Sequence, residues 1–295
     1  MNYRLKNLLL FPMNILYRIS PKLELKILFF LKQGYRLNLK NPKTYNEKLN
    51  WQKIFYHNAE MSLCSDKYLV RDYLKRRGCS EYLNDLLWSG YDPNCIPYDK
   101  LPNQFVIKVT HGSGFNIICK NKEQINKKLI KKRLTSWLKT KYIKCYGECW
   151  YNRERPRIIV EKYLENNDSK PLFDYKFFCF DGKPTYVYVD TWKDGKHHIN
   201  MYDVKLTRLD NVSLGYPTDF DTLVEKPPNY DEMLLLAHKL STGFPHVRVD
   251  MYNVNNKIVF GEMTFSKGAG FDKILPFDFD LEMGSFFKLE EKNDF

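Results

Sequence analysis

Residues 246–264 read HVRVDMYNVNNKIVFGEMT. Apolar and polar residues alternate in two runs that a turn signal separates, which predicts a β-hairpin. Alternate residues of a strand point to the same face, so Arg248 and Asp250 share one face of the first strand. Glu262 and Thr264 share a face of the return strand for the same reason. If the strands pair in the natural register, Asp250 and Glu262 come close together.

Two carboxylates beside an arginine describe a site for a hard cation and a phosphate group. Mg²⁺ is bound by few carboxylates and leaves coordination positions for phosphate oxygens. The hairpin therefore predicts a metal-assisted phosphate site. The alternative is an ordinary hairpin whose polar side faces solvent.

A second hairpin is expected upstream of the first. Residues 174–180 (DYKFFCF) and 184–190 (PTYVYVD) flank a DG turn, which is a strong hairpin signal. Asp174 and Lys176 share a face of its first strand, so the lysine is available for a phosphate contact. A surface ion pair between these two residues is the alternative.

A glycine-rich loop, HGSGFN at 111–116, follows a short buried strand at 105–109 that contains Lys108. Glycines let backbone N–H groups approach anionic oxygens, and a lysine adds a positive charge. The spacing differs from that of the Walker P-loop. The loop therefore predicts a phosphate contact of another kind, with a plain turn as the alternative.

Residues 157–164 (RIIVEKYL) form a β-branched strand that ends in a carboxylate and apolar positions. This composition suits a slot for adenine, whose amino group a glutamate and the backbone can bind.

Helices are expected at 41–56, which opens with a capping box, and at 65–77 and 231–242. Strands and helices together predict an α+β protein with antiparallel sheets in two lobes.

The net charge of +12 is concentrated in two segments. Residues 1–43 hold nine Lys and Arg against Glu24 alone, and residues 120–144 hold ten against Glu123 alone. The rest of the chain is mildly acidic and has no RNA-binding or zinc-finger pattern, so no nucleic acid is expected as a partner. The lysine-rich 120–144 segment has the spacing of a solvated helix, which could also attract an anionic glycan.

The composition, 43% apolar and 28% charged, is typical of a folded protein. Seven cysteines, an odd number without paired CxxC spacing, indicate reduced thiols and a cytoplasmic location.

Residues 1–35 mix apolar and basic residues, and two prolines divide them into short helices. Their longest uncharged run is too short to span a bilayer, and they lack a signal-peptide cleavage site. This arm either packs on the body or lies on an anionic membrane surface at the inner face of the membrane.

In chain order, these motifs resemble the ATP-grasp superfamily, and more closely its teichuronopeptide-biosynthesis (TupA-like) branch, which is found in bacterial surface-polysaccharide loci. The resemblance covers roughly residues 40–285. It runs through NPKTYNEKLNWQK, SDKYLVR, KVTHGSGFN, RIIVEKYL, DYKFFCFDGKP, VRVDMY and FGEMTFSKGAG. At one position the chain departs from the general pattern, because Thr264 stands where ATP-grasp enzymes commonly have asparagine as the last metal ligand.

The resemblance implies an α+β ATP-grasp fold in which two lobes with antiparallel sheets clamp ATP, next to a helical basic N-terminal segment. The expected regions are a basic amphipathic arm (1–40), an N-terminal helical/α+β region (41–104), a small lobe with the phosphate loop (105–164) and a large lobe with the metal site (165–295).

The resemblance also implies a set of roles. The implied nucleotide-binding residues are Lys108, His111, Gly112, Ser113, Gly114, Asn116, Glu161, Lys162, Tyr163, Leu164, Asp174 and Lys176, the implied catalytic residues are Arg248 and Lys176, and the implied ligands of Mg²⁺ are Asp250, Glu262 and Thr264. The implied activity is an ADP-forming carboxylate–amine ligase that uses ATP and Mg²⁺. It would join a sugar acid or glycan acceptor, such as a uronic acid, to an amino acid or amine through an acyl phosphate, in capsule or lipopolysaccharide biosynthesis.

Other functions remain open at this point. A glycosyltransferase of a polysaccharide locus would use an Asp-x-Asp metal motif, and both 219–221 and 278–280 have that pattern. A kinase could phosphorylate a glycan through the same ATP cleft, and a membrane-associated scaffold would need no catalysis. No spacing supports a serine or cysteine nucleophile.

Overall fold

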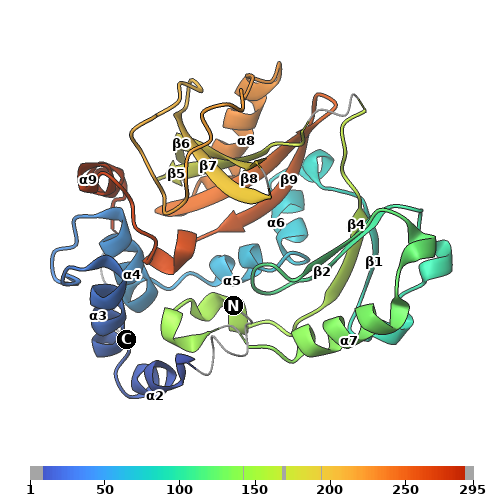
Figure 1. Cartoon of the computed structure of the whole chain (residues 1–295). Helices are drawn as coiled ribbons and strands as arrows, with labels where there is room; N and C mark the ends of the chain where they lie inside the picture. The colour runs from blue at the N-terminus through green and yellow to red at the C-terminus, as the bar shows by residue number, and fades with distance from the viewer. Residues whose placement is uncertain (1–8, 142, 168–170, 194, 290–295) are drawn as a thin grey trace.

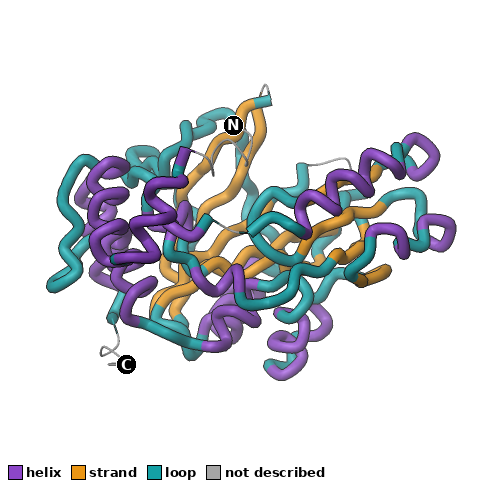
Figure 2. The backbone as a smooth tube through the Cα atoms, turned by 90° about the horizontal axis from the view of Figure 1, so that it is seen from below, coloured by secondary structure: helices purple, strands orange, loops and turns teal. Residues whose placement is uncertain are grey.

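The computed structural model describes residues 9–141, 143–167, 171–193 and 195–289. Two antiparallel sheets form its framework, one of four strands and one of five. They belong to two lobes, and helices lie along their outer sides (Figure 1, Figure 2). The expected α+β class with antiparallel sheets is confirmed.

The smaller sheet has the strand order β1-β4-β2-β3. Its strands are β1 (Leu86–Gly90), β2 (Phe105–Val109), β3 (Asn116–Cys119) and β4 (Ile158–Lys162). Alternate residues of β2 and β4 form a separate core with Ile130 and Leu134 of α7 (Lys127–Leu138). Lys108 and Glu161 lie on the opposite face, because successive side chains of a strand point to opposite sides.

The larger sheet has the strand order β7-β6-β5-β8-β9. Its strands are β5 (Asp174–Phe180), β6 (Lys183–Lys193), β7 (Lys196–Asp203), β8 (His246–Val254) and β9 (Lys257–Thr264). One face packs against α8 (Tyr230–Ser241) through buried apolar residues such as Phe177 and Val249. The other face carries the polar residues of the two expected hairpins.

The β8–β9 hairpin contains a β-bulge. Asp250 lies opposite Glu262, but the next pair is Met251 and Phe260, which leaves Gly261 as the extra residue. A Cβ at Gly261 would lie 3.1 Å from the carbonyl oxygen of Asp250. Glycine therefore lets the strand bend directly beside the two carboxylates.

Four further helices are α4 (Tyr45–Phe55), α5 (Ala59–Ser65), α6 (Val70–Arg76) and α9 (Phe277–Phe286), of which α5 and α6 lie between the two lobes (Figure 1). The expected capping box opens α4, because Thr44 Oγ1 accepts from the Glu47 N–H and Glu47 Oε2 accepts from the Thr44 N–H, each at 3.1 Å. Helix α9 packs across α4.

The basic arm forms α2 (Phe11–Ile19) and α3 (Pro21–Gln33), and residues 1–8 lie outside the described part of the chain. Pro12 and Pro21 each stand at a helix start, where the missing N–H costs little. Within the described ranges, no helix is long and apolar enough to cross a membrane.

Two strands were not expected from the sequence. Strand β1 pairs with β4, so the smaller sheet includes residues that precede the expected small lobe at 105–164. Strand β7 pairs with β6 and forms an edge of the larger sheet. Both are edge strands, and neither β1 (LLWSG) nor β7 (KHHINMYD) has a clear alternating pattern.

Candidate active site

A row of polar side chains crosses the face of the larger sheet that points away from α8. Lys176 on β5 lies opposite Asp250 on β8, and Asp250 lies opposite Glu262 on β9. Two residues further along, Arg248 lies opposite Thr264. The expected hairpin register is therefore confirmed, and these five residues form the polar row.

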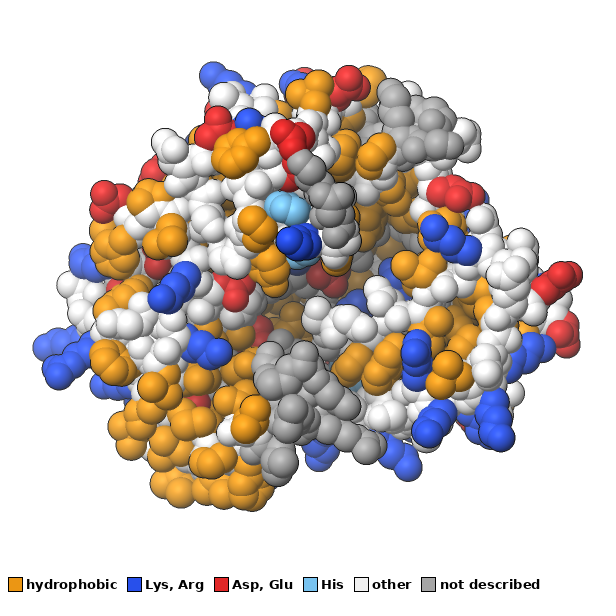
Figure 3. Space-filling view, in the orientation of Figure 1, with side chains coloured by type: hydrophobic (Ala, Val, Ile, Leu, Met, Phe, Trp, Pro, Cys, Tyr) orange, Lys and Arg blue, Asp and Glu red, His pale blue; other side chains and the backbone are white. Residues whose placement is uncertain are grey.

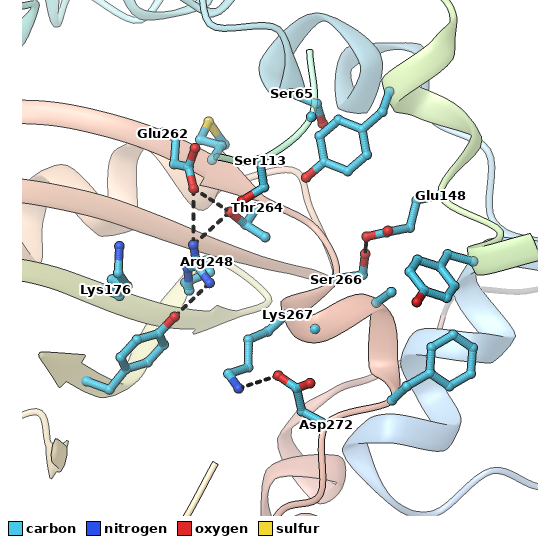
Figure 4. Close-up of a pocket in the computed structure, with 18 of the residues that line it drawn as sticks. Ser65, Ser113, Glu148, Lys176, Arg248, Glu262, Thr264, Ser266, Lys267 and Asp272 are labelled. Carbon is cyan, nitrogen blue, oxygen red and sulfur yellow. Dashed lines mark hydrogen bonds and ion pairs between the residues drawn. The ribbon is translucent and has the colours of Figure 1, made fainter. Parts of the chain in front are cut away.

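Arg248 is the centre of the polar row (Figure 4). Its Nε donates to Asp250 Oδ1 at 2.7 Å and its Nη2 to Asp250 Oδ2 at 2.6 Å. The same Nη2 lies 2.9 Å from Thr264 Oγ1 and 3.3 Å from Glu262 Oε1, and Nη1 donates to the Tyr188 hydroxyl at 2.8 Å. Burial would lower the pKa of Arg248, but the Asp250 carboxylate holds it well above its usual value. The guanidinium is therefore a fixed positive charge.

Lys176 lies between two carboxylates. Its Nζ donates to Asp250 Oδ2 at 2.9 Å and to Asp174, and Asp190 lies 3.6 Å away. Burial opposes the charged form of Lys176, but Asp250 and Asp174 raise its pKa well above the usual value. Burial also raises the pKa of Asp174 to about 6, although Lys176 acts in the opposite direction. Lys176 therefore remains cationic at neutral pH.

Glu262 differs from Asp250 in its exposure. The side chain of Glu262 is 41% exposed, whereas that of Asp250 is 1% exposed. Desolvation would raise the pKa of Glu262, but the charges of Lys67, Arg248 and other lysines lower it to about 2. Glu262 is therefore an ionised carboxylate that can be reached from solvent.

The glycine loop uses left-handed backbone at Gly112 (φ +70°) and Gly114 (φ +75°), a region that side chains with a Cβ rarely adopt. Lys67 Nζ donates to the Gly112 carbonyl at 2.9 Å and holds the loop near the polar row. His111 turns away from it, because its Nε2 donates to the Thr140 carbonyl at 2.7 Å. Burial lowers the pKa of His111, so this residue anchors the loop as a neutral side chain.

Two adjoining cavities meet over the polar row. The inter-sheet cavity, of about 430 Å³, is lined from both lobes. Among the predicted site residues, its lining includes Lys108, Ser113, Gly114, Asn116, Glu161, Leu164, Asp174, Lys176, Asp250 and Glu262. The η7 cavity, of about 560 Å³, is named for the short helix η7 (Lys267–Gly270) and is also lined by Gly112, Ser113, Arg248 and Thr264.

Three predicted residues do not line either cavity. His111 is one of them, and Lys162 and Tyr163 line a different cavity, of about 1280 Å³, between the end of β4 and the turn of the β8–β9 hairpin. Leu164 lines both that cavity and the inter-sheet cavity. The structure therefore separates part of the expected adenine segment from the polar row.

Lys108 and Glu161 form an ion pair across the smaller sheet. Lys108 Nζ lies 2.8 Å from Glu161 Oε2, and Arg71 Nη1 lies 3.5 Å from Glu161 Oε1. The glutamate is buried and the lysine remains partly exposed toward the inter-sheet cavity. Both predicted residues therefore lie together, with the lysine as the more accessible group.

Several site residues were not predicted from the sequence. Lys67, Asp190 and His197 line both cavities, next to the polar row. His197 Nε2 lies 2.9 Å from Asp190 Oδ1, and the indole of Trp192 stacks on the imidazole with ring centroids 5.1 Å apart. Lys67 belongs to the SDKYLVR segment of the resemblance, but His197 lies on the unexpected strand β7 and had no local signal.

Lys267 is a second lysine that sequence reasoning missed, although it lies in the FSKGAG segment. It is 5% exposed, and its Nζ donates to Asp272 Oδ2 at 2.7 Å and to the Leu214 carbonyl at 2.8 Å (Figure 4). Burial lowers its pKa, while Asp272 opposes that shift. The η7 cavity thus has a lysine at its wall, on the side away from the glycine loop.

The residues of the polar row can bind Mg²⁺ only if a second ligand supplies further oxygen atoms. In the described ranges, no group of three or more His, Cys, Asp or Glu side chains is placed to hold a metal ion. Asp250 and Glu262 supply carboxylate oxygens and Thr264 a hydroxyl, but both oxygens of Asp250 already accept from cations. Mg²⁺ bound through one or two carboxylates usually takes its remaining oxygens from phosphates and water. The donor set fits a metal that binds together with a phosphate ligand.

The two Asp-x-Asp motifs have structural partners. Asp219 is buried and accepts from the N–H groups of Asp221 and Thr222, which closes a turn. Asp280 is buried on α9 and accepts from Asn46 on α4 through backbone and side-chain nitrogens. Neither motif lines the inter-sheet cavity or the η7 cavity. The geometry therefore does not favour a glycosyltransferase site at either motif.

Comparisons with solved structures return several ligases of low identity. D-alanine–D-alanine ligase from Bacillus anthracis, complexed with ATP, is 16% identical with a TM-score of 0.39, over 69% of this chain and 55% of that chain. The Helicobacter pylori enzyme is 16% identical with a TM-score of 0.42, over 77% and 62%. D-cycloserine synthetase DcsG is 15% identical with a TM-score of 0.42, over 76% and 69%. The chain thus spans less than two thirds of both D-alanine–D-alanine ligases.

No curated protein sequence matches the chain. The model of one protein family, described as TupA-like ATP-grasp, matches residues 47–288. This match contains both sheets, the glycine loop and the whole polar row. The chain belongs to the TupA-like ATP-grasp family.

Proposed function

We propose that this protein is an ADP-forming carboxylate–amine ligase that depends on ATP and Mg²⁺. The observation that carries the proposal is the polar row at the junction of two cavities. One cavity borders the glycine loop and both sheets, and the other extends toward Lys267. A nucleotide and an acid can therefore meet over Arg248.

In this proposal, the inter-sheet cavity binds ATP. Its volume of about 430 Å³ is within the range of small-molecule sites. Lys108 and Lys176 supply positive charge for phosphates, and the backbone at Gly114 can approach them closely because it has no Cβ. Apolar lining residues such as Leu164 and Phe260 provide a surface for the base.

Mg²⁺ would be held by Asp250 and Glu262. The Thr264 hydroxyl would either bind the metal directly or hydrogen-bond to a water molecule bound to the metal. When bound, it supplies neutralisation of the phosphate charge that develops during transfer. The accessible carboxylate of Glu262 is the principal contact in this assignment, because the oxygens of Asp250 also bind Arg248 and Lys176.

The proposed reaction has two steps. A carboxylate oxygen of the acid attacks the γ-phosphorus of ATP, the bond to ADP breaks, and an acyl phosphate forms. The amine nitrogen then attacks the acyl carbon, phosphate leaves, and the nitrogen loses one proton. In this proposal, Arg248 stabilises the transferring phosphoryl group, and His197, which is bound to Asp190 at the cavity wall, would accept the proton.

The η7 cavity would bind the acid, and its lining supports a sugar acid such as a uronic acid. Lys32, Lys67 and Lys267 offer charge for a carboxylate, while Asp272 and Tyr216 can bind sugar hydroxyls. Exposed lysines of α7 would attract an anionic glycan from a distance. Together with the surface-polysaccharide context that the sequence resemblance implies, this supports a role in capsule or lipopolysaccharide biosynthesis, with an amino acid or amine as the second substrate.

A hydroxamate assay tests the proposal. Hydroxylamine replaces the unknown amine, and glucuronic and galacturonic acids are offered with ATP and Mg²⁺. The expected result is hydroxamate and ADP in equal amounts, both lost in Glu262→Gln. ADP without hydroxamate, with phosphate retained on the sugar, would instead identify a glycan kinase and contradict the ligase.

A further inference from the structure

The helices α2 and α3 present a continuous apolar surface that no described residue covers. We define the arm surface as the exposed face of residues 9–43. The space-filling view shows apolar side chains gathered over α2 (Figure 3). The exposed large apolar residues of the arm surface are Leu9, Phe11, Ile15, Ile19, Leu23, Ile27, Phe30 and Leu31.

Helix α3 is apolar on two faces. Leu25, Leu28 and Phe29 are buried in the main core, so the helix is firmly part of the body. Leu23 and Ile27 recur at a spacing of four residues on the other side and remain exposed. The buried face attaches the arm to the body, but the exposed apolar face makes no contribution to the core.

The charges of the arm surface all have one sign. Within the described part of the arm, every lysine and arginine is exposed, namely Arg18, Lys22, Lys26, Lys32, Arg36, Lys40 and Lys43. Glu24, the one acidic residue, is turned inward and has no exposed surface. Burial raises the pKa of Glu24 to about 8, despite the nearby charge of Lys53, so the carboxyl is mostly neutral at pH 7. The surface therefore combines apolar side chains with unopposed positive charge.

A second copy of this chain is a poor occupant for this face. A two-fold dimer places the same patch against itself, so the seven cations of one copy would face those of the other. Like charges brought together at an interface cost several kcal/mol. A lipid surface with anionic headgroups satisfies both features at once, because its acyl chains accept apolar side chains and its phosphates attract the cations.

The arm surface lies next to the η7 cavity. Lys32, in the last turn of α3, lines that cavity, and Gln33 Nε2 donates to the Asp272 carbonyl at 3.1 Å. On α2, Asn14 Oδ1 accepts from the N–H of Cys145 at 3.0 Å, next to the cavity residue Tyr146. A bilayer on the arm surface would therefore lie close to one wall of the cavity.

We propose that the arm surface docks the protein on an anionic phospholipid bilayer, with α2 and α3 lying in the plane of the headgroups. The docked orientation brings the η7 cavity close to acceptors held at that surface. Binding to the bilayer itself does not depend on the ligase assignment, because it uses none of the residues of the polar row.

Co-sedimentation of the full chain with vesicles tests this proposal. Phosphatidylcholine vesicles are compared with vesicles that also contain phosphatidylglycerol, at low and high salt. The expected result is binding to the anionic vesicles alone, weakened by salt. Arg18→Gln with Lys26→Gln should lower the partition coefficient roughly fivefold for each charge removed. Ile19→Gln with Leu31→Gln should also weaken binding.

The matched control is Leu223→Gln with Leu235→Gln, two equally exposed leucines of the larger lobe. This variant should bind vesicles as the wild type does. Thermal melting and ATP calorimetry on every variant separate loss of docking from loss of fold or of nucleotide binding. Equal binding to neutral vesicles, no vesicle binding, or unchanged binding by both arm variants would overturn the proposal. So would a concentration-dependent dimer that the Ile19 and Leu31 changes abolish.

Discussion

Asp250 and Glu262 lie side by side in the polar row but have different surroundings. Asp250 is enclosed by Arg248 and Lys176, and its negative charge offsets both. Glu262 keeps 41% of its side chain exposed at the junction of the two cavities. Asp250 therefore holds the site together, whereas Glu262 is paired with Arg248 and Lys67 but stays accessible to a ligand.

Substitution should separate these two tasks. Asp250→Asn leaves two buried cations under-compensated and should cost about 3–5 kcal/mol of unfolding free energy. That corresponds to a lowering of the melting temperature by about 10 °C. Glu262→Gln should change the stability by less than about 1 kcal/mol, as for a partly exposed ion pair, yet abolish turnover. Melting curves and the hydroxamate assay measure both effects, and a Glu262→Gln variant that melts early but turns over would assign Glu262 to the fold.

Glu24 should make the stability depend on pH. Its pKa is raised from 4.5 to about 8 by burial, so between these values the folded protein holds a proton that the unfolded chain has released. Stability therefore falls as the pH rises through this window. Between pH 6.5 and 8, Glu24→Gln should lose less unfolding free energy than the wild type does.

Denaturant unfolding at several pH values measures this slope. Glu123→Gln, which alters an exposed glutamate outside the core, is the control and should keep the wild-type slope. If Glu24→Gln keeps it as well, the buried carboxyl is ionised in the folded protein, and its pKa is not raised by burial.

At the scale of elements, the glycine loop depends on its backbone conformation. Gly114 has φ +75°, and no atom lies within 4 Å of the position that an added Cβ would take, so strain rather than collision decides the effect of a substitution. Gly114→Ala should cost about 1–2 kcal/mol in the loop conformation and weaken ATP binding roughly tenfold. Gly34→Ala, at φ +86° and equally uncrowded at the end of α3, is the matched control. Equal ATP affinity in the two variants would show that the glycine loop is not part of the nucleotide site.

The elements also show how far sequence reasoning reaches. The two hairpins were predictable because alternation and a turn signal are both local, and the Asp250–Glu262 register followed from them. Strand β7 was not, because its sequence KHHINMYD has a weak alternating pattern. His197 could not be assigned to the site without that strand.

His111 illustrates a different limit. Its position in a glycine loop favoured a ligand contact, but a hydrogen bond to Thr140, distant in sequence, turns the ring away. Lys267 could not be assigned to the site from the sequence, because its position on η7 and its contact with Asp272 appear only in the folded protein. In both cases, tertiary partners decide what the side chain does.

At the scale of the whole molecule, the two sheets have separate apolar cores, and the polar row lies where their lobes meet. A ligand in the inter-sheet cavity contacts both lobes at once, so nucleotide binding should stabilise the protein as a unit. The increase follows the ratio of ligand concentration to its dissociation constant. The arm packs against the same body and borders the η7 cavity, which places the proposed membrane contact beside the proposed acid site.

Isothermal titration calorimetry of the full chain shows whether the inter-sheet cavity binds ATP with Mg²⁺. ATP and ADP should bind the wild type in the presence of Mg²⁺, and Glu262→Gln should lose the Mg²⁺-dependent part of the affinity. Mg²⁺ without nucleotide should give little heat, because both carboxylates are already paired with cations of the protein and make a weak site. Absence of ATP and ADP binding, together with binding of a UDP-sugar in the presence of Mn²⁺, would contradict an ATP site and would favour a glycosyltransferase.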